Sequence, residues 1–191
     1  IRSDGSTRVS IEQFTLSTPW DTTTISWTNF KNIKTGCFSS IQQRGLDFKP
    51  DGTRVFVASQ GNKKVGQYDL TTPWDISTAT NQVCSGFDEE QVRNIQLSAD
   101  GYTLYLGGNE DDDIKRYSLA APYDITSITL EATTFSVSSQ TGAMRGFHFS
   151  SNFTKLYVTG DTLDTIYEYD VDCAGTITCL DASTNADVKL S

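Results

Sequence analysis

The sequence predicts an all-β protein, a β-propeller of about four blades of about 50 residues and four strands each, the first blade incomplete at the N-terminus. A repeat is the first observation: the segment from Arg44 to Asp75 returns from Arg93 to Asp124, 49 residues later, and from Arg145 after a further 52. Segments such as GLDF, RVFVAS and VGQYDL alternate apolar and polar residues, as strands do. Pro-Asp-Gly and Gly-Asn turn signals separate them.

The first unit begins inside a blade. The segment from Ile11 to Leu16 aligns with a third strand, Val65 to Leu70, and Ser26 to Phe30 follows as an outer strand. No inner strand is predicted before them. One propeller domain is expected over 1–191, with units of approximately 1–40, 41–90, 91–140 and 141–191.

In each complete unit the first strand is expected to line a central channel and the fourth to form the outer edge. Alternation places one set of apolar side chains on the faces that stack between blades. These predicted core residues are Leu46, Phe48, Val55, Val57, Ile95, Leu97, Leu104, Leu106, Phe147, Phe149, Leu156 and Val158.

The incomplete first blade leaves the closure of the ring open. The segment from Val188 to Ser191 resembles Ile95 to Ser98, so the C-terminus is one candidate for the missing inner strand. An open edge could instead accept a strand from another copy, which would give a homo-oligomer or a filament. A third alternative is that the chain belongs to a longer propeller.

Composition excludes several classes of function. The 191 residues are 37% hydrophobic and carry a net charge of −9 without a clustered basic face, so no nucleic-acid partner is expected. No apolar run approaches the ~20 residues of a spanning helix, so no membrane insertion is expected. No motif indicates a cofactor. Abundant Ser and Thr together with paired Cys favour a secreted, extracellular or surface location.

The four cysteines favour disulfides, with free thiols as the alternative, over a metal site, because Cys37 and Cys84 stand alone and His148 is the sole histidine. Cys173 and Cys179 flank a short turn-like segment and are the first predicted pair. Cys37 and Cys84 are a second candidate pair, which would tie adjacent blades. Asn152 opens a glycosylation sequon that matters where the producing cell glycosylates.

Arg44, Arg93 and Arg145 occupy the same place in three units, directly before the inner strand. Repetition around an axis would gather them at one mouth of the channel, where guanidinium groups can bind a carboxylate or phosphate bidentately. The structural interpretation is the one we favour. Loops on the same face carry carboxylates such as Glu110 and Asp161, and ion pairs between blades would then neutralise the arginines.

The acidic run from Asn109 to Asp113 could bind calcium, because hard cations take clustered oxygen ligands. It lacks the spacing of a dedicated calcium loop, so we interpret it as a solvated turn and predict no metal site.

Trp20, Trp74 and Tyr123 recur in S-T-P-W-D, T-T-P-W-D and A-A-P-Y-D. Proline presets a turn, and the aromatic ring can cover the edge of the blade. A repeated aromatic platform for sugars is the functional alternative, so these three residues are candidate ligand-binding residues.

The search for a catalytic group finds no nucleophile with a base, no carboxylate pair with a defined role and no metal triad, so no catalytic residue is predicted. His148 has no repeated partner and is interpreted as a packed or channel-lining residue.

The run KPDGTRVFVASQGNKKVGQYDL resembles the repeat of YVTN-type, lactonase-like β-propellers, and the likeness covers about three units. The added T-P-W-D resembles repeats of bacterial and phage surface proteins. The resemblance implies a propeller fold and leaves two functions open. Our first expectation is a protein that is not an enzyme, a structural or adhesive module on a cell or virion surface with a protein or cell-surface partner. The alternative is a propeller that binds a glycan or an anion, or a lactonase-like hydrolase, with its site at the channel mouth.

Overall fold

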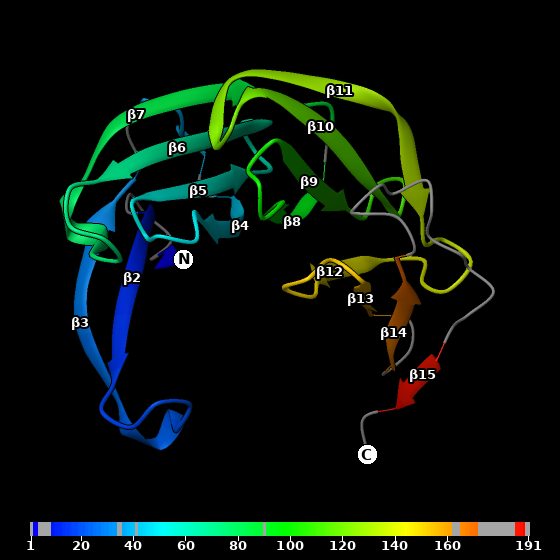
Figure 1. Cartoon of the computed structure of the whole chain (residues 1–191), viewed down its shortest axis with the longest axis horizontal. Coiled ribbons are helices and arrows are strands. Elements are labelled where there is room, and N and C mark those ends of the chain that lie inside the picture. Colours follow the sequence, from blue (N-terminus) through cyan, green and yellow to red (C-terminus); the bar gives the residue numbers. More distant parts are fainter. Residues whose placement is uncertain are drawn as a thin grey trace.

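The computed structural model describes residues 2–3, 9–33, 36–40, 42–89, 91–161, 165–171 and 186–189. Within them, four antiparallel sheets follow one another along the chain and lie in an arc, with the first and last sheets at its two ends (Figure 1). Contacts between sheets run from each one to the next. This arrangement confirms the predicted all-β, propeller-type fold.

The first sheet has the order β1-β2-β3, formed by Arg2–Ser3, Val9–Leu16 and Ile25–Asn32. β2 and β3 are the two strands that the sequence predicts for this unit. A short strand, β1, also precedes them, with Arg2 opposite Ser10 and Ser3 opposite Val9. Because β1 pairs with β2 as β5 pairs with β6, it holds the place of a second strand rather than of an inner strand.

Each of the three other sheets has four strands, and β4, β8 and β12 lie on the inside of the arc (Figure 1). The second sheet consists of β4 (Gln43–Phe48), β5 (Arg54–Ser59), β6 (Lys64–Leu70) and β7 (Ala79–Gly86). The third consists of β8 (Val92–Leu97), β9 (Thr103–Gly108), β10 (Asp113–Ala121) and β11 (Asp124–Ser136). The fourth consists of β12 (Met144–Phe149), β13 (Lys155–Gly160), β14 (Thr165–Asp170) and β15 (Ala186–Lys189).

The position of β15 contradicts the proposed closure of the ring by the C-terminal strand. β15 pairs antiparallel with β14, with Ile166 opposite Val188 and Glu168 opposite Ala186. It is therefore the outer strand of the fourth sheet rather than an inner strand of the first.

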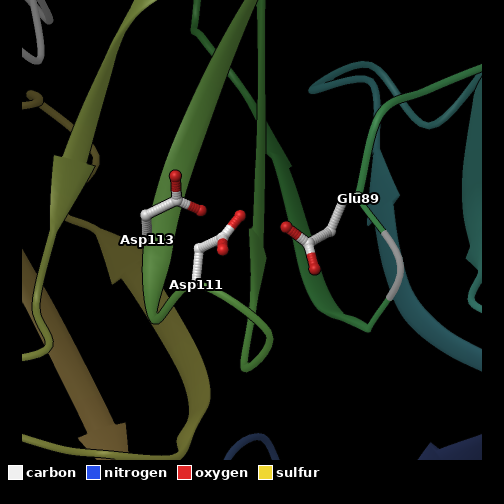
Figure 2. A group of neighbouring side chains, drawn as sticks. All are labelled: Glu89, Asp111 and Asp113. Carbon is white, nitrogen blue, oxygen red and sulfur yellow. The ribbon is translucent and has the colours of Figure 1, made fainter.

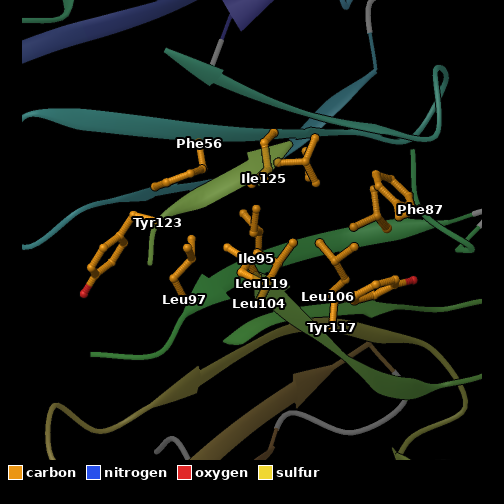
Figure 3. Close-up of a cluster of buried hydrophobic side chains, with 13 residues drawn as sticks. Phe56, Phe87, Ile95, Leu97, Leu104, Leu106, Tyr117, Leu119, Tyr123 and Ile125 are labelled. Carbon is orange, nitrogen blue, oxygen red and sulfur yellow. The ribbon is translucent and has the colours of Figure 1, made fainter. Parts of the chain in front are cut away.

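The core lies between adjacent sheets, as Figure 3 shows for the second and third. There Phe56 and Ala58 of β5 and Val65 of β6 pack against the buried residues of β8, β9 and β10. Of the predicted core residues, Leu46 and Phe48 are partly buried against the cluster between the first and second sheets. The other ten predicted core residues are buried: Val55, Val57, Ile95, Leu97, Leu104, Leu106, Phe147, Phe149, Leu156 and Val158.

A disulfide links Cys37, in the segment after the first sheet, to Cys84 on the outer strand of the second, with their Cα atoms 5.6 Å apart. This confirms the pairing that would tie adjacent blades. Cys173 and Cys179 lie outside the described residues.

Short 3₁₀ turns at Thr22–Thr24 (η1) and Ile76–Thr78 (η2) precede the outer strands of the first two sheets. Neither they nor any other helical segment in the described part of the chain is long and apolar enough to cross a bilayer.

Candidate functional site

The three repeated arginines each stand at a β-bulge in an inner strand. In β4, Gln43 pairs with Ser59 of β5 and Gly45 pairs with the adjacent Ala58. Arg44, which lies between them, therefore has no partner in β5 and is the extra residue of the bulge. The same shift occurs around Arg93 in β8 and around Arg145 in β12. A bulge bends the strand and re-aims the unpaired side chain, and bulges are over-represented next to functional sites.

Each arginine of this cluster (Arg44, Arg93 and Arg145) donates from Nε to a residue 16 positions further along its own sheet. The acceptor of Arg44 is Oε1 of Gln60 at 3.2 Å, and that of Arg93 is Oδ1 of Asn109 at 2.9 Å. Two acceptors are therefore neutral amides.

The third member, Arg145, donates to Oδ2 of Asp161 at 3.0 Å and forms an ion pair with it. Ion pairing thus neutralises one arginine, and its partner belongs to the same sheet rather than to a neighbouring blade. Within the described residues, neither Arg44 nor Arg93 has a carboxylate at ion-pairing distance.

The arginines are close enough to influence one another. Arg93 also donates from Nη1 to Oε1 of Gln60 at 3.4 Å, so it shares an acceptor with Arg44 of the neighbouring sheet. Partial burial lowers the pKa of Arg93, the positive charges of Arg44 and Arg145 lower it further, and Asp161 opposes them. The cluster therefore holds unbalanced positive charge, which a bound anion would offset.

A second set of equivalent residues lies three positions further along the inner strands: Asp47, Gln96 and His148. Oδ2 of Asp47 accepts from the backbone N–H of Leu97 at 2.7 Å, and Oε1 of Gln96 accepts from that of Phe149 at 2.8 Å. These bonds tie each inner strand to the next.

His148 is exposed on β12. Burial raises the pKa of Asp47, while hydrogen bonds from the backbone N–H groups of Leu97 and Phe48 and the charge of His148 lower it. The interpretation of His148 as a residue without a repeated partner overlooked these equivalent positions. Aligning the units at this position would have shown its equivalence to Asp47 and Gln96.

The three repeated aromatic residues do not share one environment. Trp20 is 96% exposed, Trp74 is 50% exposed, and Tyr123 is buried at 8%. The rings of Trp74 and Tyr123 cover the turn glycines Gly52 and Gly101, so in these two sheets the ring closes over the turn.

The acidic run is less solvated than the sequence suggested. Asp112 and Asp113 are buried, and Oδ1 of Asp112 accepts from the backbone N–H of Met144 at 2.7 Å, in the fourth sheet. Asn152 is exposed at a turn, where its Oδ1 accepts from the hydroxyls of Ser150 and Thr154 at 2.7 and 2.9 Å.

No family model matches the chain, and no curated protein matches it in sequence. The fold does match solved structures. One is the periplasmic gluconolactonase of Pseudomonas aeruginosa, with a TM-score of 0.57 and 15% identity over 93% of this chain and 50% of that one. Presumed 6-phosphogluconolactonases of Bacteroides fragilis and Bacteroides uniformis match with TM-scores of 0.55 and 0.54, both at 14% identity over 94% of this chain and 50% of theirs.

The fold is therefore similar to that of lactonase-like propellers, and the chain spans about half the length of those it matches. These comparisons correct the expectation that the protein is not an enzyme, because structures sharing its fold are named as lactonases, which are hydrolytic enzymes. The setting on a cell or virion surface and any self-association stay predictions.

Proposed function

We propose that this chain forms part of a lactonase-like hydrolytic propeller, in which the arginine cluster binds the anionic group of a small-molecule substrate at the mouth of the central channel. One observation carries the proposal. Three inner strands each place an arginine at a β-bulge, and Arg44 and Arg93 hydrogen-bond to amides instead of carboxylates.

Amide acceptors hold a guanidinium group in place without neutralising it. A guanidinium group presents several N–H donors in a fork that matches a carboxylate or phosphate. Gln60 and Asn109 thus orient Arg44 and Arg93 while leaving their charge available. We infer that the substrate carries a carboxylate or phosphate group.

His148 is our candidate general base. It follows Arg145 by three residues, which is roughly 10 Å along a strand. A sugar-sized lactone held by its anionic group at the arginine cluster would extend toward this imidazole. His148 would take a proton from water as the oxygen adds to the lactone carbonyl, and the ring C–O bond would then break with that proton passing to the alcohol.

The Cys37–Cys84 disulfide supports a location outside the cytoplasm, in an extracellular or periplasmic compartment, because disulfides persist where the environment is oxidising. Such a location suits a hydrolase that acts on soluble sugar lactones.

The proposal is tested by measuring the hydrolysis of a phosphorylated and of an unphosphorylated sugar lactone, with the protons released by the acid product as the signal. We expect Arg93→Gln to raise KM for the phosphorylated lactone and to leave KM for the uncharged one unchanged. Arg116→Gln is the matched control, because it removes the same charge from β10, where Arg116 pairs with Glu131 at 3.0 Å. A folded protein that hydrolyses neither lactone above the spontaneous rate would overturn the proposal.

A further inference from the structure

The third sheet contains a cluster of three carboxylates that the arginine site does not use. Glu89 precedes β8, Asp111 lies in the turn between β9 and β10, and Asp113 begins β10. One oxygen from each lies within 4.8 Å of the others, and Figure 2 shows the three side chains converging on one another. We call these residues the acidic cluster.

Two of the three carboxylates are buried, which separates this cluster from an ordinary acidic surface. Glu89 is 1% exposed and Asp113 is 6% exposed, whereas Asp111 opens to solvent. Thr134 hydrogen-bonds the Asp113 carboxylate, but Oδ1 of Asp113 is buried and has no hydrogen-bond partner in the described structure. Burying such an atom is costly unless a ligand satisfies it.

Lys115 provides only part of the charge that the cluster needs. Its Nζ lies 3.2 Å from Oε2 of Glu89 and 3.4 Å from Oδ2 of Asp111, and it donates to the carbonyl of Asp88 at 2.9 Å. Three carboxylates and one ammonium leave a net charge of −2, which a divalent cation would balance.

The repeat shows that the fold itself does not require acids here. In the second sheet Ser40 stands at the place of Glu89 and Asn62 at the place of Asp111. The backbone N–H of Ser40 donates to Oδ1 of Asn62 at 3.0 Å, so a neutral pair holds the equivalent turn. In the third sheet this neutral pair is replaced by two carboxylates, and Asp113 adds a third.

We propose that Glu89, Asp111 and Asp113 form a binding site for a divalent cation, and that the cation is calcium. Ligands of this site would all be oxygens, and calcium accepts carboxylates in flexible geometry together with water. The exposed Asp111 gives the ion a route from solvent, and the buried Glu89 and Asp113 would hold it against the sheet.

Terbium luminescence on the intact chain provides the test, because terbium replaces calcium and takes up energy from nearby tyrosine. Tyr117 is well placed as the donor, since its hydroxyl accepts from the backbone N–H of Asp88 at 3.2 Å, beside the cluster. We expect a saturable terbium signal that calcium displaces.

Asp111→Asn is the decisive variant, because Asp111 is exposed and its replacement leaves the core intact. Glu110→Gln is the matched control, with the same change of charge one residue away. Loss of one carboxylate ligand should weaken binding roughly tenfold or more in Asp111→Asn and leave it unchanged in Glu110→Gln. Lys115→Gln should tighten binding, because the cluster then carries three uncompensated charges.

No calcium-displaceable signal in the wild type would overturn the proposal. Equal weakening by Asp111→Asn and Glu110→Gln would also overturn the proposal. Such a result would show that the overall negative charge of the surface attracts the ion and that the three carboxylates do not bind it specifically.

Discussion

Arg145 and Asp161 form an ion pair 16 residues apart, and Arg93 and Asn109 occupy the equivalent places in the third sheet with an amide in place of the carboxylate. This difference sets the charge of the arginine cluster. We predict that Asn109→Asp weakens binding of a phosphorylated sugar acid about tenfold, because a new carboxylate would compete for Arg93.

Asp161→Asn is the reciprocal change, and it should strengthen binding of the same ligand by freeing Arg145. Calorimetric titration of both variants measures the two effects. Shifts of the same sign in the two variants would contradict the proposed role of these acceptors.

The disulfide should be a major source of stability. Breaking the Cys37–Cys84 link opens a loop with a sequence separation of 47 residues. In the chain-entropy account this costs about 4 kcal/mol of unfolding free energy. Urea denaturation of Cys37→Ala, Cys84→Ala and the double variant checks the value. The three losses should be nearly equal, because either substitution breaks the same bond, whereas additive losses would show that the two sulfurs act separately.

Gly101 is required by both backbone and packing. Its φ is +77°, and an added Cβ would lie 2.4 Å from the ring of Tyr123. We expect Gly101→Ala to lower the unfolding free energy by about 1–3 kcal/mol. Gly86→Ala is the control, because the nearest atom to its added Cβ is 3.9 Å away. Similar effects at the two positions would refute this explanation.

Asp47 should make stability fall as the pH rises. Burial raises the pKa of Asp47, so at this group the folded protein binds a proton more tightly than the unfolded chain does. The resulting loss begins near the unfolded aspartate value of ~3.9 and is complete above the folded pKa. Asp47→Asn should flatten this part of the profile of unfolding free energy against pH.

Asp100→Asn is the comparison of opposite sign. Hydrogen bonds from the Ser98 hydroxyl and the backbone N–H of Tyr102 lower the pKa of Asp100. Its stabilisation is therefore present above the unfolded value and is lost as the pH falls through the folded pKa. Two variants with the same profile would show that neither carboxyl controls the pH dependence.

The repeat predicted the fold well because the spacing of the units and the alternation of apolar and polar residues within each strand can both be read directly from the sequence. The 49-residue offset from Arg44 to Arg93 placed the strands, and the apolar alternation of segments such as Val55 to Val57 placed the core. The final strand was misplaced. Val188 resembles an inner-strand residue, but pairing with Ile166 on β14 decides its position.

The candidate site was predictable in its residues but not in its geometry. Equivalent positions singled out Arg44, Arg93 and Arg145, yet the bulges that re-aim them depend on register between strands, which no local pattern encodes. The acidic cluster was missed for a related reason. Glu89 lies outside the run from Asn109 to Asp113 and joins it only through the packing of the third sheet.

Calorimetric titration of a phosphorylated aldonic acid, the product form of the proposed substrate class, into the wild-type chain and Arg93→Gln tests the central claim most directly. The account predicts saturable binding by the wild type that weakens about tenfold or more when the Arg93 guanidinium is lost. Arg116→Gln should bind like the wild type. Equal affinities for the wild type and Arg93→Gln, or no binding by the folded wild type, would contradict an anion site at the arginine cluster.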